Sequence, residues 1–224
     1  MDPAMEVYYT VERSTTLYHA ADSSRPYLNL RFREPVYVLE NGGDWALVRT
    51  VDGANGMVRY GHLSNVWIRV SKSEQTLYVY RGPELLASYP TDLGYNFFSD
   101  KIKRGSLAEP DHWRTPTGRF YVASKNASSQ FYKALVLNYP NREDAERGMR
   151  DGIITKDQYE SIVRADESIS MPPMDTGLGG WIEIHGDGTG ARRNWTQGCI
   201  AITNAQMDQI WNWVDVGTPV LVEP

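Results

Sequence analysis

Short stretches in which apolar and polar positions alternate fill the first 70 residues. Residues 45–50 (Trp-Ala-Leu-Val-Arg-Thr) fit an in-and-out alternation, and residues 35–40, 57–60 and 66–70 are similarly short and apolar. Turn-forming runs separate these stretches: Asn41-Gly42-Gly43-Asp44, Asp52-Gly53 and Asn55-Gly56. Short strands punctuated by hairpin-type turns predict a small β-barrel over residues 5–70.

The rest of the chain, residues 71–224, predicts a second and mainly β domain. Strands are expected at residues 77–80, 84–89, 118–123, 135–138, 181–184 and 219–222. Helices are expected at 141–149, 155–164 and 204–215. Thr155-x-x-Gln158 and Thr203-x-x-Gln206 are capping boxes, in which two side chains satisfy free amides at a helix start. The last helix carries an apolar stripe that predicts core packing rather than a cofactor site: Met207, Ile210, Trp211 and Val214.

Composition excludes several functional classes. The chain has 224 residues, a hydrophobic fraction of 41% and a net charge of −5, which argues against a nucleic-acid partner because phosphate binding needs excess Lys and Arg. No apolar run approaches the roughly 18 residues of a transmembrane helix. The N-terminus lacks the basic and apolar regions of a signal peptide. The one basic cluster, Lys101, Lys103 and Arg104, is interpreted as a solvated turn.

No metal or cofactor is predicted. Gly186-x-Gly188-x-x-Ala191 formally matches a dinucleotide fingerprint, but no helical pattern follows it. His185-Gly186-Asp187 lacks a third metal ligand at suitable spacing, and the single cysteine forms neither an internal disulfide nor a cysteine pair for zinc.

The single cysteine instead has a candidate base. His185 ends a predicted strand and Cys199 begins another 14 positions later, so the loop between them can fold back and bring the two side chains together. A neighbouring histidine can move a thiol pKa from about 8.5 to roughly 3.5–7.5, which predicts rapid alkylation below pH 8. The carbonyl of Gly186 is placed to orient the imidazole, and the amides of Gln197, Gly198 and Cys199 are oxyanion-hole candidates.

These residues resemble the L,D-transpeptidases with a YkuD-type catalytic domain. The resemblance spans about residues 67–224 and rests on five elements in order: Leu77-Tyr78-Val79-Tyr80, Thr115-Pro116-Thr117-Gly118-Arg119-Phe120, Trp181-Ile182-Glu183-Ile184-His185-Gly186, Thr196-Gln197-Gly198-Cys199-Ile200 and Gly217-Thr218-Pro219-Val220. It implies a β-sandwich catalytic domain in the cell envelope or periplasm that acts on peptidoglycan stem peptides. It further implies that Cys199 attacks the carbonyl of the third stem residue, usually meso-diaminopimelate, and releases D-alanine. His185 matches the family's base, and Gly186 matches the carbonyl that orients it.

The chain departs from the commonest family pattern at one position. The family usually has Ser-His-Gly-Cys, whereas this chain has Thr196-Gln197-Gly198-Cys199, and Gln197 cannot carry a proton. The run from Trp195 to Ala201 is similar to a branch that includes L,D-carboxypeptidases and enzymes that release peptidoglycan-attached proteins. Hydrolysis and cross-linking therefore both stay open. Residues 5–70 resemble bacterial SH3-like domains in the spacing of their strands and turns.

Further residues are candidates for binding substrate. Arg104, Arg192 and Arg193 are candidate partners of substrate carboxylates, because guanidinium pairs with carboxylate through two hydrogen bonds. Tyr132, Trp195 and Thr196 are candidate cleft-lining residues. The helical insertion at 141–180 is expected to fold over the cleft as a lid that narrows substrate choice.

Two other functional classes are alternatives to the enzyme. One is a non-catalytic wall-binding protein that uses its SH3-like part, against which the intact pair of His185 and Cys199 argues. The other is a general cysteine protease, which would need a separate Asn or Asp to orient its histidine. The sequence predicts no oligomeric state.

Overall fold

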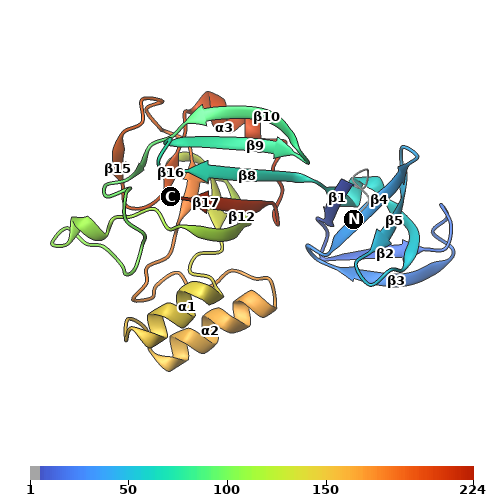
Figure 1. The fold of residues 1–224 in the computed structure, drawn as a ribbon, viewed down its shortest axis with the longest axis horizontal. Coiled ribbons are helices and arrows are strands. Elements are labelled where there is room, and N and C mark those ends of the chain that lie inside the picture. The colour runs from blue at the N-terminus through green and yellow to red at the C-terminus, as the bar shows by residue number, and fades with distance from the viewer. Residues whose placement is uncertain (1–5) are drawn as a thin grey trace. The chain divides into compact units, whose positions relative to one another are not determined.

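The computed structural model describes residues 6–224, so the predicted absence of a signal peptide falls outside the described residues. The chain divides into two compact units (Figure 1). The first contains the residues up to Val66 together with Arg81–Glu84, and the second contains Trp67–Tyr80 and Leu85–Pro224.

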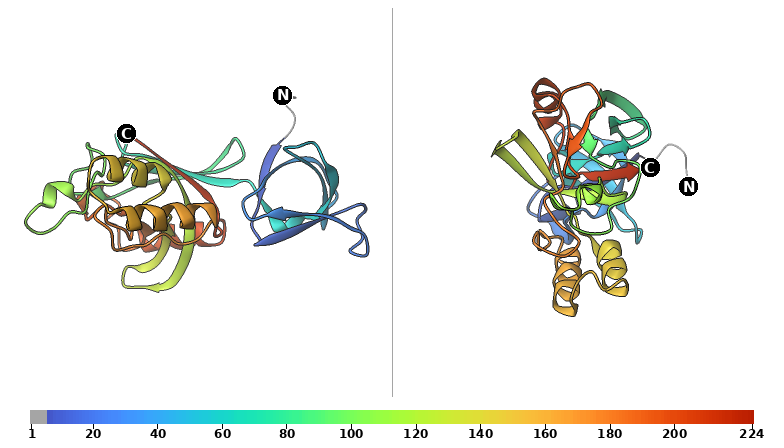
Figure 2. Two further views of the ribbon diagram at one scale, coloured as in Figure 1. Left: turned by 90° about the horizontal axis from the view of Figure 1, so that it is seen from below. Right: turned by 90° about the vertical axis from the view of Figure 1, so that its left-hand side faces the viewer.

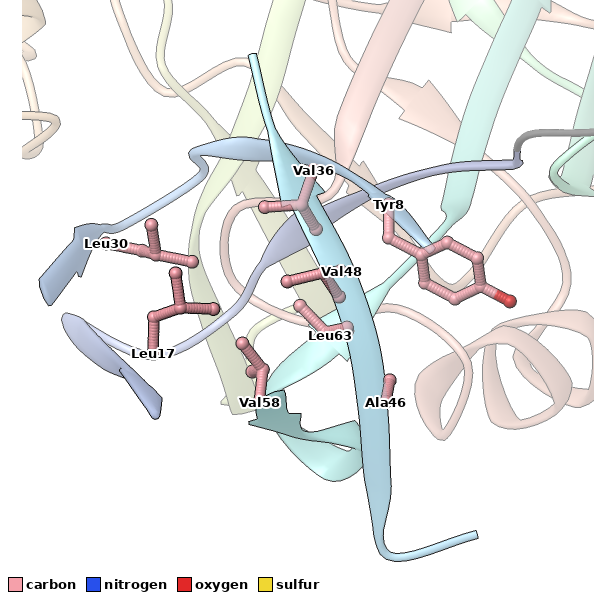
Figure 3. Close-up of a cluster of buried hydrophobic side chains, with 8 residues drawn as sticks. All are labelled: Tyr8, Leu17, Leu30, Val36, Ala46, Val48, Val58 and Leu63. Carbon is pink, nitrogen blue, oxygen red and sulfur yellow. The ribbon is translucent and has the colours of Figure 1, made fainter. Parts of the chain in front are cut away.

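The N-terminal unit is a sheet of seven strands that curls around one core (Figure 2). In the order β3-β2-β6-β5-β4-β1-β7, the strands are β3 (Pro26–Arg31), β2 (Ser14–Tyr18), β6 (Asn55–Arg59), β5 (Trp45–Thr50), β4 (Pro35–Asn41), β1 (Glu6–Thr10) and β7 (Leu63–Ser64). A short 3₁₀ turn, Tyr60–His62, precedes β7. Alternate side chains of these strands point inward, as the pattern predicts, and form the cluster of Figure 3: Tyr8, Leu17, Leu30, Val36, Ala46, Val48, Val58 and Leu63.

Two local features of this region differ from the prediction: the turn expected at Asn55-Gly56, and the sheet to which the strand at 66–70 belongs. Asn55 and Gly56 lie in β6 rather than in a turn, and Gly56 is needed there because a Cβ would come within 2.6 Å of Leu17 Cγ. The predicted strand at 66–70 forms β8 (Val66–Ser71), which pairs in parallel with β17 (Pro219–Glu223) in the sheet of the second unit. Its backbone therefore completes that sheet rather than the N-terminal one.

The second unit is built on a mixed, curled sheet of eight strands in the order β10-β9-β8-β17-β12-β13-β14-β16. Besides β8 and β17, these are β9 (Thr76–Arg81), β10 (Glu84–Pro90), β12 (Gly118–Ser129), β13 (Tyr132–Leu137), β14 (Glu183–His185) and β16 (Ile200–Ala201). A small parallel pair, β11 (Leu93–Gly94) with β15 (Asn194–Thr196), lies beside it in the fold, and a 3₁₀ turn spans Pro110–His112. The short strands β14 and β16 at one edge bring the predicted histidine and cysteine segments together.

Three helices complete this unit: α1 (Arg142–Arg150), α2 (Lys156–Glu167) and α3 (Asn204–Trp211). Capping boxes at Thr155 and Thr203 are confirmed, and Asn141 forms a third at the start of α1. Helices α1 and α2 lie side by side at one end of the unit (Figure 1) and share a small core of Ala145, Ile154, Ile162 and Leu178. Among the residues described, none of the helices is long and apolar enough to span a membrane.

Helix α3 ends at Trp211, four residues before the predicted end at residue 215. Lys125 Nζ donates to the carbonyls of Trp211 and Val214, at 2.7 Å each. An ammonium at these C-terminal carbonyls satisfies acceptors that have no partner within the helix. Met207, Ile210 and Val214 are buried, so the predicted packing of the stripe is confirmed although Val214 lies beyond the helix.

Candidate active site

The parallel pairing of β14 with β16 sets His185 and Cys199 on one face of the sheet. Ile184 is in register with Ile200, so Cys199, which immediately precedes β16, lies beside Glu183. Glu183 and His185 are two positions apart on β14 and therefore point to the same face. All three side chains line one cavity of about 860 Å³.

His185 is fixed in the form that a general base requires. The residue is buried, and its Nδ1 lies 2.6 Å from the carbonyl oxygen of Gly186. Because a carbonyl only accepts, Nδ1 carries the proton and Nε2 is left unprotonated. The ring also stacks on Phe131 with 4.5 Å between centroids. Burial lowers the pKa of His185 below 6.5, although the hydrogen bond to Gly186 favours the charged form. The imidazole is therefore neutral at pH 7.

Gly186 is required beside this histidine for steric reasons. A Cβ at this position would lie 2.5 Å from Asn204 Oδ1 and 2.9 Å from the Phe131 carbonyl oxygen. Any larger residue would move the carbonyl that orients the imidazole.

Cys199 differs from the prediction in its protonation. Its Sγ lies 3.4 Å from the Trp181 carbonyl oxygen, and the residue is half-buried. Burial of the sulfur raises the thiol pKa to about 12, and the negative charge of Glu183 is the second cause of this rise. The Lys101 ammonium lowers the thiol pKa, but by less. The expected low pKa is therefore wrong, because desolvation outweighs the nearby positive charge. The resting pair is a neutral thiol and a neutral imidazole.

Asp92, which no sequence motif singles out, shapes the loop between the two strands. Its buried carboxylate accepts hydrogen bonds from the Thr189 amide and hydroxyl, the Arg193 amide and Trp195 Nε1, at 2.6–2.8 Å. Burial pushes the pKa of Asp92 upward, but these donors outweigh it and leave the pKa below its ordinary value. The ionised Asp92 thus holds Trp195 in place, and the Trp195 ring meets His185 edge-on at 6.1 Å.

Gly198 is fixed by the turn that presents the cysteine. Its φ is +130°, and a Cβ would lie 2.5 Å from the Arg114 carbonyl oxygen. Its amide donates to Thr196 Oγ1 at 3.2 Å, and that hydroxyl donates to the Cys199 carbonyl at 2.7 Å. The predicted oxyanion donors are therefore reduced to the amides of Gln197 and Cys199.

The other predicted substrate-binding residues fall into two groups. Arg104, Trp195, Thr196 and Gln197 line the cavity. Arg104 is already occupied, with its guanidinium 2.6 Å from Asp175 and hydrogen-bonded to the carbonyls of Met174 and Thr176.

Tyr132, Arg192 and Arg193 are not among the residues that line the cavity, so the cleft-lining prediction for Tyr132 is wrong, whereas carboxylate binding by the two arginines stays a prediction. The Tyr132 hydroxyl donates to both carboxylate oxygens of Asp208 at 2.9 Å. Arg192 reaches the Glu74 carbonyl and the Thr76 hydroxyl instead. The Arg193 backbone is held by Asp92 and Leu93.

The helical insertion contributes to the cavity only through its final residues. Gly179 and Gly180 line it, together with the adjacent Trp181, whereas α1 and α2 supply no lining residue. The two helices therefore do not form the predicted lid over the cleft. The opposite wall comes from the β12–β13 hairpin, through Asn126, Ser129, Gln130 and Phe131. Sequence reasoning missed this hairpin as part of the site, along with Lys101 and Glu183.

Within residues 6–224, no group of three or more His, Cys, Asp and Glu side chains is arranged to hold a metal ion. The ionisable side chains that line the cavity carry a thiol, an imidazole, a carboxylate, an ammonium and a guanidinium group.

A curled β fold with a cysteine and a buried histidine on one cavity defines the class of protein. The model of the YkuD family, the L,D-transpeptidase catalytic domain, matches residues 65–222. The chain therefore belongs to this family, whose members act on peptidoglycan peptides. No curated protein matches the chain.

Several solved structures are similar to the chain. The helical cell shape determining protein Pgp2 from Campylobacter jejuni is 21% identical, with a TM-score of 0.47 over 71% of this chain and 48% of Pgp2. Bd1075 from Bdellovibrio bacteriovorus is 20% identical, with a TM-score of 0.44 over 71% of this chain and 48% of Bd1075. An L,D-transpeptidase from Mycobacterium smegmatis is 14% identical, with a TM-score of 0.41 over 98% of this chain and 82% of that protein. The chain spans about half the length of the first two.

Proposed function

We propose that this protein is a cysteine-dependent enzyme of peptidoglycan stem peptides that cleaves the bond between meso-diaminopimelate and D-alanine. The observation that carries the proposal is that Cys199 and His185 line one cavity, with the His185 tautomer set by the 2.6 Å contact to Gly186. An unprotonated Nε2 on the cavity that the only thiol of the chain also lines is the combination of base and nucleophile that nucleophilic catalysis uses.

The first half-reaction forms a thioester. His185 Nε2 removes the proton from Cys199 Sγ while the sulfur attacks the carbonyl carbon of diaminopimelate. The amides of Gln197 and Cys199 donate to the oxyanion that develops. When the carbon–nitrogen bond breaks, the imidazolium returns its proton to the leaving nitrogen, so D-alanine departs as an amine and the acyl group stays on sulfur.

The second half-reaction decides between two activities. If water attacks the thioester, the product is a tripeptide and the activity is that of an L,D-carboxypeptidase. If an amine from a second stem attacks, the product is a cross-link and the activity is that of an L,D-transpeptidase. In both cases His185 accepts a proton from the attacking group, and the thiol is restored. Gln197 supplies no second proton carrier. The Trp195-Thr196-x-Gly198-Cys199 run is similar to the branch that includes carboxypeptidases, and this resemblance supports hydrolysis beside transfer.

The N-terminal unit, described from residue 6 to Val66, is proposed to be an SH3-like wall-binding domain, followed by a catalytic domain that begins at about Trp67. Its curled sheet and short turn-linked strands support this assignment. A peptidoglycan substrate supports a location in the cell envelope or periplasm.

The proposal is tested with purified disaccharide-tetrapeptide and mass identification of the products. We expect loss of D-alanine alone for a carboxypeptidase and dimers for a transpeptidase, with neither product from Cys199→Ala. If wild-type protein leaves the tetrapeptide intact yet sediments with peptidoglycan, the protein is a binding module and the enzymatic proposal is wrong.

A further inference from the structure

Lys101 is a buried cation in the wall of the cavity. Only 3% of its surface is exposed, and it lines the same cavity as Cys199 and His185. Among the described residues, the only hydrogen bond of its Nζ is a long one, 3.4 Å, to the His112 carbonyl oxygen. An ammonium has three donors, so most of its hydrogen-bonding capacity is unused. The interpretation of residues 101–104 as a solvated turn is wrong at this position.

No acidic side chain of the described chain forms an ion pair with Lys101. Its two cationic neighbours each have one: Arg104 pairs with Asp175, and Arg114 pairs with Asp111. Asp100 lies nearby, but its carboxylate accepts from the amides of Thr117 and of Lys101 itself and lies 3.6 Å from Arg147.

Lys101 thus adds to the cavity wall a positive charge that no ion pair among the described residues neutralises, although the Glu183 carboxylate lines the same cavity. Burial and the neighbouring guanidinium groups oppose that charge and lower the pKa of Lys101 to about 8, whereas the Cys199 sulfur, when ionised, and Asp100 favour it. A buried ammonium without a partner is costly, and an anionic ligand would remove that cost.

The backbone at Lys101 is held by the helical insertion. Arg147, on α1, donates to the Lys101 carbonyl at 2.9 Å and pairs with the buried Asp144 at 2.7 Å. Gly179, from the end of the insertion, faces the Lys101 side chain, because a Cβ added at this glycine would lie 3.3 Å from Lys101 Cε. The insertion thus fixes the position of this lysine rather than covering the cleft.

We propose that Lys101 binds the free carboxylate of the D-amino acid that leaves, and so selects stem peptides that end at that residue. This inference rests on the proposed function. In such a substrate the terminal carboxylate carbon lies only about 4 Å from the carbonyl under attack, since consecutive peptide units repeat every 3.8 Å or so. A carbonyl held against Cys199 Sγ therefore places the carboxylate in the same cavity, where Lys101 supplies the free donors. A stem with one more residue places an uncharged amide there instead.

The test compares two substrates that differ at one group: the disaccharide-tetrapeptide with a free terminal carboxylate, and the same compound ending in D-alaninamide. Wild-type kcat/KM is expected to be about 10- to 100-fold lower on the amide, as for loss of a hydrogen bond to a charged group. In Lys101→Met, kcat/KM on the acid should fall by the same factor, whereas kcat/KM on the amide should change little. The ratio of the two kcat/KM values should therefore be close to one. Lys103→Met changes a half-buried lysine of the same loop that pairs with Glu109 and does not line the cavity; this matched control should keep the wild-type ratio.

Two results would overturn the inference. A wild-type enzyme that cleaves acid and amide equally well refutes it without any variant. A Lys101→Met protein that is slower on both substrates by the same factor assigns the lysine to the sulfur or the oxyanion instead. Thermal melting of Lys101→Met, and of Lys101→Gln as a second variant, shows whether a loss of activity in a variant comes from misfolding. If wild-type protein cleaves neither compound, the proposed function itself fails, which is a distinct outcome.

Discussion

Replacing His185 with Gln is expected to lower kcat/KM for D-alanine release by about 10²- to 10⁴-fold, the usual contribution of a positioned general base. The thiol of Cys199 has a pKa of about 12, so almost no thiolate exists at neutral pH unless the imidazole takes the proton during attack. Glutamine keeps hydrogen-bonding capacity in this position but accepts no proton.

The pH profile separates this role from a structural one. In the wild type the base must be neutral, and burial lowers the pKa of His185 below 6.5. Activity should therefore be lost as the pH falls through that lowered pKa and should be level around pH 7. In His185→Gln the residual activity should instead rise about tenfold per pH unit, because it depends on spontaneous ionisation of the thiol. The control is His62→Gln, a histidine of the N-terminal unit. A His185→Gln enzyme within tenfold of wild type would contradict the assigned role.

Alkylation of Cys199 by iodoacetamide should be slow at pH 7 and should accelerate steeply in alkali. With a thiol pKa of about 12, the thiolate fraction at pH 7 is about 10⁻⁵, against about 3% for an unperturbed cysteine. The rate should therefore be about 10³-fold below that of free cysteine. Because the group reacts only when deprotonated, a raised pKa moves the whole profile to higher pH. Intact mass measured against time at several pH values gives the rates.

A pair of variants tests the cause of that shift. Glu183→Gln removes the negative charge that disfavours the thiolate, so it should lower the thiol pKa and speed alkylation at every pH below it. Glu146→Gln changes an exposed glutamate on α1 and should leave the rate at the wild-type value. Rapid alkylation of wild-type protein at pH 6 would instead reveal a preformed thiolate–imidazolium pair.

Local signals in the sequence predicted most of the elements. Capping boxes at Thr155 and Thr203 located two helix starts, because a cap is decided by side chains within four residues of one another. The alternating run at residues 45–50 became β5 with the same bounds. The return of the chain between the His185 and Cys199 segments was also predicted, and the β14–β16 pairing places both residues on one cavity.

Long-range charge placement could not be predicted in this way. Asp92 organises a loop about 100 positions further along the chain, and no spacing rule connects the two segments. Lys101 lay in a run of cations typical of a solvated surface, and only the packing of the insertion against it reveals its burial. The same limit explains Arg192 and Tyr132, whose side chains have partners outside the cavity.

The thiol pKa was also beyond sequence reasoning. The motif predicted that His185 lowers the pKa of the Cys199 thiol. In the structure, burial and the Glu183 carboxylate raise that pKa instead. A motif names the reacting groups, but the balance of desolvation and charge that sets their resting protonation depends on neighbours drawn from several strands.

The most direct measurement is the intact mass of the protein after acid quenching of a reaction with disaccharide-tetrapeptide. The account predicts an adduct equal to the substrate less D-alanine, located on the Cys199 peptide, released by hydroxylamine and missing from Cys199→Ala. D-alanine released by wild-type protein without such an adduct, together with undiminished release by Cys199→Ala, would contradict it.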